Sequence, residues 1–371
     1  MLQALFCAQG LAQALLDSPL NAASTVTISN SAPRTSPSGA ILDAHDGKVT
    51  LHAGTFYWHA MSYGGCTEPA GPNGCADWAA PQACGFRYDH NVSLFTSTDL
   101  VHWSEPTTVF SAASNLGVPG AVVYAPKVLR RGDGTWVLWV NWNTVRKGFN
   151  GSGSPWAQSY YATATAPSPE GPFVLATLRV NSRYASVGDL NLFSSGGAEA
   201  YVIYTGNLAP SYSSRFVMSV EQLTADWTDS LGAAASSGRI DAAVLSVEGP
   251  AAFRTPDGTY HAVYGKTCCF CANGTRALTE YTAAHPLGPW SRQGVVGDIY
   301  LGAQSTDVFA YANGAGQPAF LYYGNRWQTS PDETKGHDFT LWAPVTFGAR
   351  GAMEAIQRLD CFNITLPQRQ L

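Results

Sequence analysis

Short apolar runs with a period of two recur along most of the chain, separated by tight turns. The runs are rich in aromatic and β-branched residues, as in Phe56-Tyr57-Trp58-His59-Ala60 and Trp136-Val137-Leu138-Trp139-Val140. Alternation of this kind predicts half-buried β-strands. Glycine-containing turns such as Gly132-Asp133-Gly134 precede the runs, and no convincing amphipathic helix interrupts them. The pattern therefore predicts an all-β protein.

The strands group into five similar units, each with an inner strand, a turn, an aromatic-rich strand and an outer hairpin. The inner strands are expected to begin near His45, Tyr124, Gly188, Val247 and Gln304. A period of roughly 50–70 residues, with about four short strands per unit, is typical of a β-propeller. One such sheet cannot bury both of its faces alone, so the units stack around an axis. We therefore predict a five-bladed β-propeller; the alternative is a β-sandwich with a chance repeat.

The propeller is expected to span residues 39–350. Residues 1–38 are interpreted as a leader and linker, with a Ser/Thr/Pro/Asn-rich stretch from about residue 21 to 39. The apolar segment Met1 to Leu16 is broken by glutamines and has no basic residue, so it is a degenerate signal peptide or a short helix. Residues 351–371 are interpreted as a C-terminal tail. No run of about 20 apolar residues predicts a membrane span.

Composition narrows the possible partners. Hydrophobic residues make up 45% of the chain and charged residues 13%, which indicates a well-cored globular protein. The net charge is -5 and no basic block occurs, which argues against nucleic acid and anionic membranes as partners. Trp (11), Tyr (17) and Phe (16) are abundant, as in sugar-binding clefts, although aromatic residues are also ordinary β-core. We expect a monomer.

Cysteines and glycosylation sequons favour an extracellular protein. Six of the eight cysteines form two clusters in Gly/Pro/Asn-rich loops, and neither cluster has paired Cys-x-x-Cys zinc spacing. The clustered cysteines are Cys66, Cys75, Cys84, Cys268, Cys269 and Cys271. Four sequons begin at Asn91, Asn150, Asn273 and Asn363. Together these features predict a secreted glycoprotein with disulfide-bonded loops.

Polar residues occupy one phase of the repeat, where the inner strands approach the axis. They are Asp46, Tyr124, Asp189, Glu248 and Gln304. Three of the five are carboxylates in a chain with few acids. Inverting glycoside hydrolysis needs one protonated and one ionised carboxyl group, about 6.5–9.5 Å apart so that a water fits. A third carboxylate near the acid raises its pKa by like-charge repulsion. Blades that converge on one axis can bring carboxyl groups from different strands to these separations.

Several motifs resemble glycoside hydrolase family 43, a family of inverting five-bladed propeller enzymes. His45-Asp46-Gly47 resembles its base motif, although many members have Pro at the position of Gly47. Gly188-Asp189-Leu190-Asn191-Leu192-Phe193 and Glu248-Gly249-Pro250 resemble the second-Asp and acid motifs. The resemblance covers about residues 40 to 347. The family's outer-strand sequence motifs also recur, in residues 97–103, Glu170-Gly171-Pro172-Phe173 and Leu287-Gly288-Pro289-Trp290.

Within this family the chain is most similar to the exo-β-1,3-galactanase group. The matching motifs are Ala44-His45, Ala125-Pro126-Lys127, Gln304-Ser305-Thr306 and Gly324-Asn325-Arg326-Trp327. The group has no Asp in blade one and uses the Gln as an unusual base, whereas this chain has Asp46. The group's blade-two Glu, which contacts a sugar hydroxyl, is Tyr124 here, and its late Gly-Asp-Arg-Trp motif has Asn325 in place of Asp.

The resemblance implies a role for each polar residue. Glu248 would be the general acid, Asp46 the general base, and Asp189 the residue that tunes the pKa of the acid. Gln304 would position the water or sugar, or act as an alternative base. Structural interpretations stay open: Glu248 can be ion-paired at a strand start, Asp189 can cap a turn, and Asp-Gly is a common turn dipeptide.

Further residues are candidates for sugar contact. His45 can bind a sugar hydroxyl, support Asp46 or be structural, and Tyr124 can form a wall of the cleft. The candidates for stacking on sugar are Trp78, Trp142, Trp327 and Trp342. His337 is a weaker candidate, as a ligand of an axial ion or water of the kind that some family members have.

The predicted function is inverting hydrolysis of a plant- or algal-type polysaccharide, best described as exo-β-1,3-galactanase activity. The chemistry requires no cofactor and no metal. A β-xylosidase or α-L-arabinofuranosidase of the same family is one alternative. A catalytically inactive propeller that binds glycans or proteins is another, and it would bind without turnover.

Overall fold

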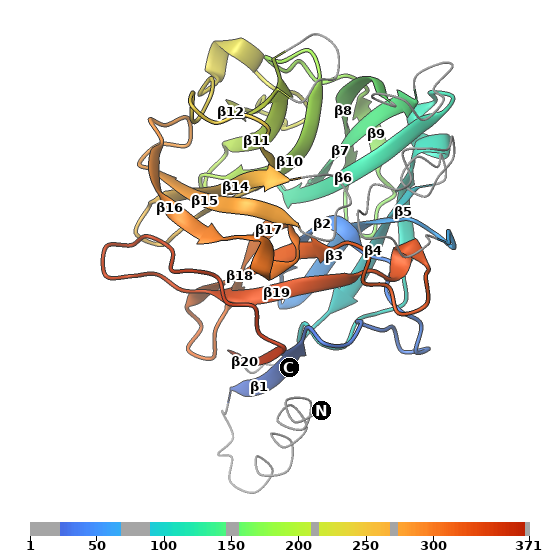
Figure 1. Ribbon diagram of the computed structural model, residues 1–371. Coiled ribbons are helices and arrows are strands. Elements are labelled where there is room, and N and C mark those ends of the chain that lie inside the picture. Colours follow the sequence, from blue (N-terminus) through green and yellow to red (C-terminus); the bar gives the residue numbers. More distant parts are fainter. Residues whose placement is uncertain (1–22, 68–89, 146–155, 209–214, 268–273, 368–371) are drawn as a thin grey trace, which may run out of the picture.

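The computed structural model describes residues 23–67, 90–145, 156–208, 215–267 and 274–367. Within them, five antiparallel sheets form the blades of a propeller (Figure 1). Blade one consists of β2 (His45–His52), β3 (Thr55–Ser62), β4 (Asn91–Ser97) and β5 (Thr107–Ser111). Blade two consists of β6 (Ala121–Arg130), β7 (Trp136–Val145), β8 (Trp156–Ala166) and β9 (Val174–Thr177). Blade three consists of β10 (Val187–Ser194), β11 (Ala200–Asn207) and β12 (Phe216–Gln222).

Blade four consists of β13 (Glu248–Arg254), β14 (Tyr260–Thr267), β15 (Thr275–Ala283) and β16 (Ser291–Gly297). Blade five consists of β17 (Gln304–Ala312), β18 (Pro318–Arg326) and β19 (Phe339–Val345). Four short helical turns connect strands: η4 (Ala112–Leu116), η5 (Gly232–Ala235), η6 (Ile299–Leu301) and η7 (Lys335–His337). The predicted five-bladed propeller is confirmed. In the described part of the chain, blades three and five have three strands rather than the expected four.

The repeated outer-strand motifs lie in turns, not in strands. In blade one the turn follows β4, and the carboxylate of Asp99 accepts hydrogen bonds from the backbone N–H groups of Val101 and His102. The fourth strands begin after these turns, at Thr107 in blade one and at Val174 in blade two. The prediction of strand at these motifs was wrong because capping side chains favour turns over ladder pairing.

One segment expected to be a linker is a strand. β1 (Ser24–Ser29) pairs antiparallel with β20 (Cys361–Leu366), and the two lie side by side in Figure 1. The ribbon therefore extends beyond the 39–350 limits expected for the propeller. Four consecutive β-branched residues, 25–28, favour a strand here, and Ile28 packs with Phe362 and Ile364 into the hydrophobic cluster formed by blades one and five. The ribbon covers the junction where the first and last blades meet.

All five inner strands carry a β-bulge near their start, at the second or third residue in four blades and at the fifth and sixth in blade two. The register shifts lie between His45 and Lys48, Tyr124 and Lys127, Val187 and Leu190, Glu248 and Ala251, and Ser305 and Asp307. A bulge re-aims the side chains beside it and locally interrupts pairing. Each inner strand therefore turns selected side chains toward the axis where it begins.

Two tryptophans that were candidates for sugar stacking belong to the core. Trp142 is buried between blades one and two and donates a hydrogen bond to the carbonyl of Leu178. Trp342 is buried among Trp58 and Trp103, with the guanidinium of Arg34 over its ring. Trp78 lies outside the described residues. No helix in the described part of the chain is long and apolar enough to cross a membrane.

Candidate active site

The bulged starts of the inner strands enclose a small cavity of about 10 Å³ on the propeller axis. Asp46, Asp189 and Lys127 contribute side chains to its wall, together with Gly249 and Thr306. These residues come from all five blades. The volume is on the order of one water molecule. The expected convergence of Asp46 and Asp189 on one point is therefore what the fold produces.

Asp46 occupies an unusual backbone conformation within its bulge. Its φ of 52° lies in the left-handed region, which non-glycine residues rarely adopt. The next residue is Gly47, and a Cβ there would lie 2.3 Å from the carbonyl oxygen of His59, so only glycine fits. The side-chain amide of Asn325 donates to Asp46 Oδ1, and Asn325 Oδ1 accepts from the Asp46 N–H at 3.3 Å. These contacts fix the carboxylate of Asp46.

Burial raises the pKa of Asp46. The positive charge of Lys127, the charge of His45 and the hydrogen bond from Asn325 act in the opposite direction. The carboxyl group thus loses its proton less readily than an exposed aspartate, and the surrounding cation and amide favour its ionised form. A carboxylate held in this way suits proton acceptance.

Asp189 is the second carboxylate at the cavity and accepts from one backbone donor and one side-chain donor. Its Oδ2 accepts from the N–H of Gly249 at 3.0 Å and from Nε2 of Gln304 at 3.1 Å. Burial and then the negative charge of Asp46 raise the pKa of Asp189 to about 6. Two neighbouring half-buried carboxyl groups disfavour each other's ionised form through like-charge repulsion.

Glu248 begins β13, directly before the bulge of blade four. Its neighbour Gly249 has a φ of 63°, and a Cβ at Gly249 would lie 2.5 Å from the carbonyl oxygen of Ser305. The same glycine donates its N–H to Asp189. The carboxyl-bearing starts of blades three and four are therefore linked through one residue, and Glu248 lies beside the cavity wall.

Gln304 has a fixed amide orientation. Its Oε1 accepts from Nε1 of Trp327 at 2.6 Å, and its Nε2 donates to Asp189. The indole nitrogen can only donate, so the amide nitrogen must face Asp189. Both ends of the amide are used within the protein. This arrangement favours the positioning role expected for Gln304 over its alternative role as a base.

His45 and Trp327 form the layer behind these groups. The two rings stack at 5.3 Å with an interplanar angle of 9°, and their exposed fractions are 0% and 1%. The ring of Tyr63 meets His45 edge-on, and the ammonium group of Lys335 lies 4.6 Å from the Trp327 ring centre. Both residues were expected to contact substrate, but their burial favours support of Gln304 and Asp46 instead.

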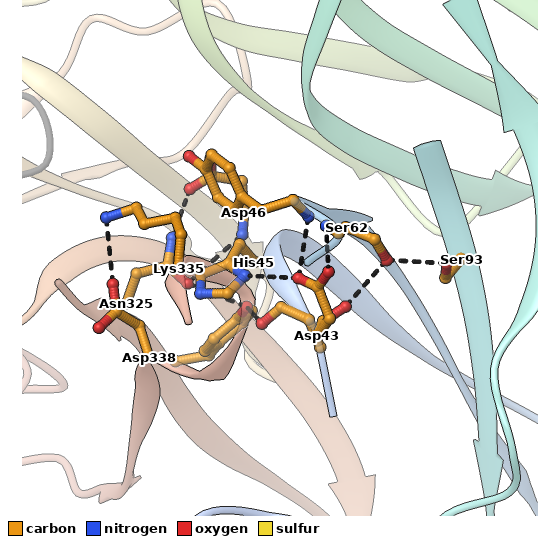
Figure 2. Close-up of polar contacts among 12 residues, drawn as sticks. Asp43, His45, Asp46, Ser62, Ser93, Asn325, Lys335 and Asp338 are labelled. Carbon is orange, nitrogen blue, oxygen red and sulfur yellow. Dashed lines mark hydrogen bonds and ion pairs between the residues drawn. The ribbon is translucent and has the colours of Figure 1, made fainter. Parts of the chain in front are cut away.

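Figure 2 shows how this layer is held around His45. Asp43 lies 3.4 Å from Nδ1 of His45 and accepts hydrogen bonds from the N–H groups of Tyr63 and Gly64. On the other side, Lys335 pairs with Asp338 at 3.1 Å. The backbone N–H of Lys335 donates to the carbonyl oxygen of Cys66 at 2.8 Å, so this loop of blade five is tied to the segment that follows β3 of blade one.

Tyr124 precedes the bulge of blade two and is 9% exposed. Its ring meets His90 edge-on at 5.7 Å. The next residue, Ala125, has a φ of 45° and lines the small cavity. The structure therefore places Tyr124 next to the cavity wall, in agreement with its expected position.

Two buried lysines below the carboxylates were not expected as site residues. Lys127 donates to three backbone carbonyls, and Lys48 donates to Asn191 and Asp307 at 3.0 and 2.9 Å. Asn325, which holds Asp46, was noted only as a departure from a motif. The sequence did carry a signal for Lys127, which is a lysine inside an otherwise apolar inner strand. A lysine is rarely buried unless it is paired, so its position indicates a polar site.

His337 does not lie on the axis. It is the last residue of η7 and pairs with Asp332 at 2.8 Å. The axial position is filled by the hydrogen-bonded group of Lys48, Asn191 and Asp307. The expectation of His337 as an axial ligand was therefore wrong, since the local turn directs it to Asp332. Among the described residues, no three His, Cys, Asp or Glu side chains are grouped to hold a metal ion.

Comparison with protein-family models identifies the family. The model of glycosyl hydrolases family 43 matches residues 43–292, which is more than half of the chain. The chain belongs to glycosyl hydrolase family 43. This family 43 member is therefore a glycoside hydrolase, and the predicted enzyme class is confirmed. A comparison with curated proteins gave no significant match.

Solved structures share the fold of this family 43 member. An exo-β-1,3-galactanase from Clostridium thermocellum aligns with a TM-score of 0.70 at 19% identity, covering 91% of this chain and 67% of that one. An exo-β-1,3-galactanase from Phanerochaete chrysosporium with β-1,3-galactotriose gives 0.66 at 21%, covering 90% and 67%. A family 43 β-1,3-galactosidase with galactodeoxynojirimycin gives 0.64 at 19%, covering 90% and 99%.

Proposed function

We propose that this family 43 enzyme hydrolyses β-1,3-linked galactan with inversion of the anomeric configuration, releasing galactose from chain ends. The observation that carries the proposal is the cavity on the axis. Asp46 and Asp189 line this cavity from blades one and three, and Glu248 directly precedes Gly249, a blade-four residue of its wall. This is the set of groups that inverting hydrolysis requires.

The roles follow from the surroundings of each group. Glu248 donates a proton to the glycosidic oxygen while the bond from that oxygen to the anomeric carbon breaks. Asp46 accepts a proton from the water whose oxygen attacks the same carbon from the opposite face. Asp189, with its pKa raised to about 6, adds negative charge beside Glu248 and disfavours early loss of the acid's proton.

The choice of Asp46 rather than Gln304 as the base rests on hydrogen bonding. Gln304 uses its amide oxygen for Trp327 and its amide nitrogen for Asp189. Asp46 has the surroundings of an ionised acceptor, with an amide donor from Asn325 and the nearby charge of Lys127. An amide locked between two partners is a positioning group, and a carboxylate is the stronger base.

The galactan assignment is supported by the solved structures that share the fold, because three of them are described as acting on β-1,3-galactosides. The sequence motifs around Ala44-His45, Gln304-Ser305-Thr306 and Trp327 point the same way. Tyr124 replaces the acidic residue of that group, and a tyrosine can pack against the face of a sugar ring.

The test is product release from β-1,3-galactan by the purified protein beside Glu248→Gln, with xylan and arabinan as parallel substrates. We expect galactose from the wild type and a loss of roughly 10²–10⁴-fold in the variant. Release of xylose or arabinose would replace the galactan assignment by a β-xylosidase or arabinofuranosidase. Glycan binding without release, by both folded proteins, would overturn the hydrolytic proposal in favour of a binding propeller.

We also propose that the protein is a secreted, glycosylated monomer with disulfide-bonded loops. Cys66 and Cys361, within the described residues, are each disulfide-bonded, which supports this part of the proposal. The sequon residue Asn363 is exposed on β20, as an attached glycan requires. The cysteine cluster at residues 268–271 and the sequons at Asn150 and Asn273 lie outside the described residues. Mass spectrometry of protein secreted by a eukaryotic host, before and after deglycosylation, tests it.

A further inference from the structure

Lys127 is a buried cation with a complete set of backbone partners. Its exposed fraction is 1%, and its ammonium group donates to the carbonyl oxygens of Asp46, Gly47 and Thr306 at 2.8, 2.7 and 3.1 Å. An ammonium group has three protons, so all three are used. The acceptors belong to β2 and β17, while Lys127 belongs to β6. One side chain therefore ties three of the five inner strands together.

Two of these acceptors define the bulge that carries the proposed base. Asp46 and Gly47 lie between the paired residues His45 and Lys48, where the ladder of blade one is interrupted. Neither residue has a paired residue in the register of the ladder, and Lys127 binds both of their carbonyl groups. Because Asp46 also has a left-handed φ, its backbone needs support from its surroundings to keep this conformation.

The distribution of charge around the axis distinguishes Lys127 from its neighbour Lys48. Lys48 is paired with Asp307, and Asn191 also donates to that carboxylate, so this pair is neutral. Lys127 contacts no carboxylate directly. It is the one basic side chain that lines the small cavity with Asp46 and Asp189. Its charge is therefore available to these two acids.

We propose that Lys127 is a positioning residue of the hydrolytic site: it holds the bulge of Asp46 in place and supplies the charge that keeps Asp46 ionised next to Asp189. The proposal rests on the proposed function, in which Asp46 must accept a proton. Without a cation, the second carboxylate would favour a proton on Asp46. With it, each acid experiences an attraction that opposes their mutual repulsion.

The groups facing Lys127 define the pH range of this effect. They are Asp46 and Lys48 on β2, Asp189 on β10 and Asp307 on β17. Burial, followed by the charge of Lys48, lowers the pKa of Lys127 to about 8, and the three aspartates oppose this. Lys127 is thus a cation below about pH 8, which includes the range around pH 6 in which Asp189 loses its proton.

Three variants test the charge. Lys127→Gln keeps a donor but removes the charge, and Lys127→Arg keeps the charge. The matched control is Lys48→Met combined with Asp307→Asn, which removes the neutral pair from the same buried layer. The readout is the carboxyl ¹³C titration of Asp46 in protein labelled at aspartate, without substrate, assigned with Asp46→Asn. The pH profile of kcat/KM on a β-1,3-galactan oligosaccharide is measured in parallel.

In Lys127→Gln we expect the Asp46 titration and the acidic limb of kcat/KM to move upward together by roughly one pH unit, the size typical of losing an opposite charge nearby. In Lys127→Arg and in the control both stay within a few tenths of a unit of the wild type. A folded Lys127→Gln protein whose Asp46 titrates as in the wild type overturns the proposal.

If Lys127→Gln does not fold, the titration of the wild-type protein tests the proposal. The Asp46 carboxyl signal should then show a second, smaller inflection at the pH where Lys127 loses its proton, followed through its ¹³Cε signal. A flat Asp46 signal across that pH overturns the proposal. The substrate-free readout separates the two hypotheses: a moved titration without polysaccharide cleavage rejects the proposed function alone, and cleavage with an unmoved titration rejects the role of Lys127 alone.

Discussion

The two ends of the inner strands differ although the same five strands form both. At their starts the ladders are bulged and enclose the small polar cavity with Asp46, Asp189 and Lys127. At the other end, residues of all five strands line an open cavity of about 620 Å³ with mostly apolar walls, including Leu192, Phe253 and Val308. Asn191, Asp307 and Lys48 form the layer between the two cavities.

This difference shows that one end of the inner strands contributes mainly to stability and that the other end carries the proposed catalytic groups. The apolar end continues the cores between blades, and its ladders pair in regular register from Ala251 to Arg254 and from Asp307 to Ala312. The polar end contains half-buried carboxyl groups and a left-handed Asp46, which disfavour the folded state locally. Substitutions at the two ends should therefore affect different properties.

The largest effect is expected for Asp46→Asn at the polar end. Removing the proposed base should lower kcat/KM on β-1,3-galactan by roughly 10²–10⁴-fold. Gln304→Ala should lower it less, because Gln304 positions Asp189 and takes no proton. Steady-state kinetics of both variants provide the measurement. A greater loss for Gln304→Ala than for Asp46→Asn would show that Gln304 is the base.

The next effect is expected at the apolar end, on stability alone. Phe253 is buried against Phe320, so Phe253→Ala should lower the free energy of unfolding by about 3–5 kcal/mol. Its kcat/KM, measured well below the melting temperature, should stay within about twofold of the wild type. Val295→Ala is the matched control, since Val295 is 50% exposed and should change stability by under about 0.5 kcal/mol. A large loss of kcat/KM in Phe253→Ala would contradict the proposed separation between an apolar end for stability and a polar end for catalysis.

Asp189→Asn should make the protein more stable at neutral pH. The pKa of Asp189 is raised to about 6 in the folded protein, so the folded state binds the proton more tightly than the unfolded state. The stability of the wild type therefore falls as pH rises from about 4 to about 6. Asparagine cannot ionise and can still accept from Gly249 and Gln304.

The gain for Asp189→Asn should be at most about 3 kcal/mol at pH 7, from about 2 pH units at about 1.4 kcal/mol each. Urea unfolding at pH 4, 5, 6 and 7 measures it, and kcat/KM should fall at the same time. A variant that is less stable than the wild type at pH 7, with an unchanged pH dependence, would contradict the account of this carboxyl group.

The smallest effect is expected for Asn325→Asp, which places a carboxylate against Asp46. Like charge raises the pKa of Asp46, so the acidic limb of kcat/KM should move upward, with a loss of about tenfold on that limb and little change above neutral pH. Asn313→Asp, in a hairpin turn distant from the axis, is the control. An unmoved acidic limb in Asn325→Asp would show that Asp46 does not govern it.

The propeller could be predicted from the sequence because its period is carried by many positions. Alternating runs and glycine turns predict the strands. The position in the repeat where each inner strand begins is occupied by the polar residues Asp46, Asp189, Glu248 and Gln304. The bulges also left a signal, because Pro126 and Pro250 cannot donate to a central ladder and are tolerated at bulges.

The support for the site could not be predicted, because a bulge breaks the period that assigns side chains to a face. His45 and Trp327 were expected at the substrate and are buried behind it. Lys127 and Asn325 contact Asp46 across blades, at a separation of 81 and 279 residues. Such contacts depend on how blades stack, and no local pattern encodes them.

The most direct test of the central claim is the anomeric configuration of the first product. ¹H NMR during hydrolysis of a β-1,3-galactan oligosaccharide follows the anomeric signals before mutarotation. Asp46 and Glu248 acting on opposite faces of the sugar predict that α-galactose appears first and the β-anomer later. β-Galactose as the first product would contradict the account, since it requires a covalent intermediate on a carboxylate of the same cavity.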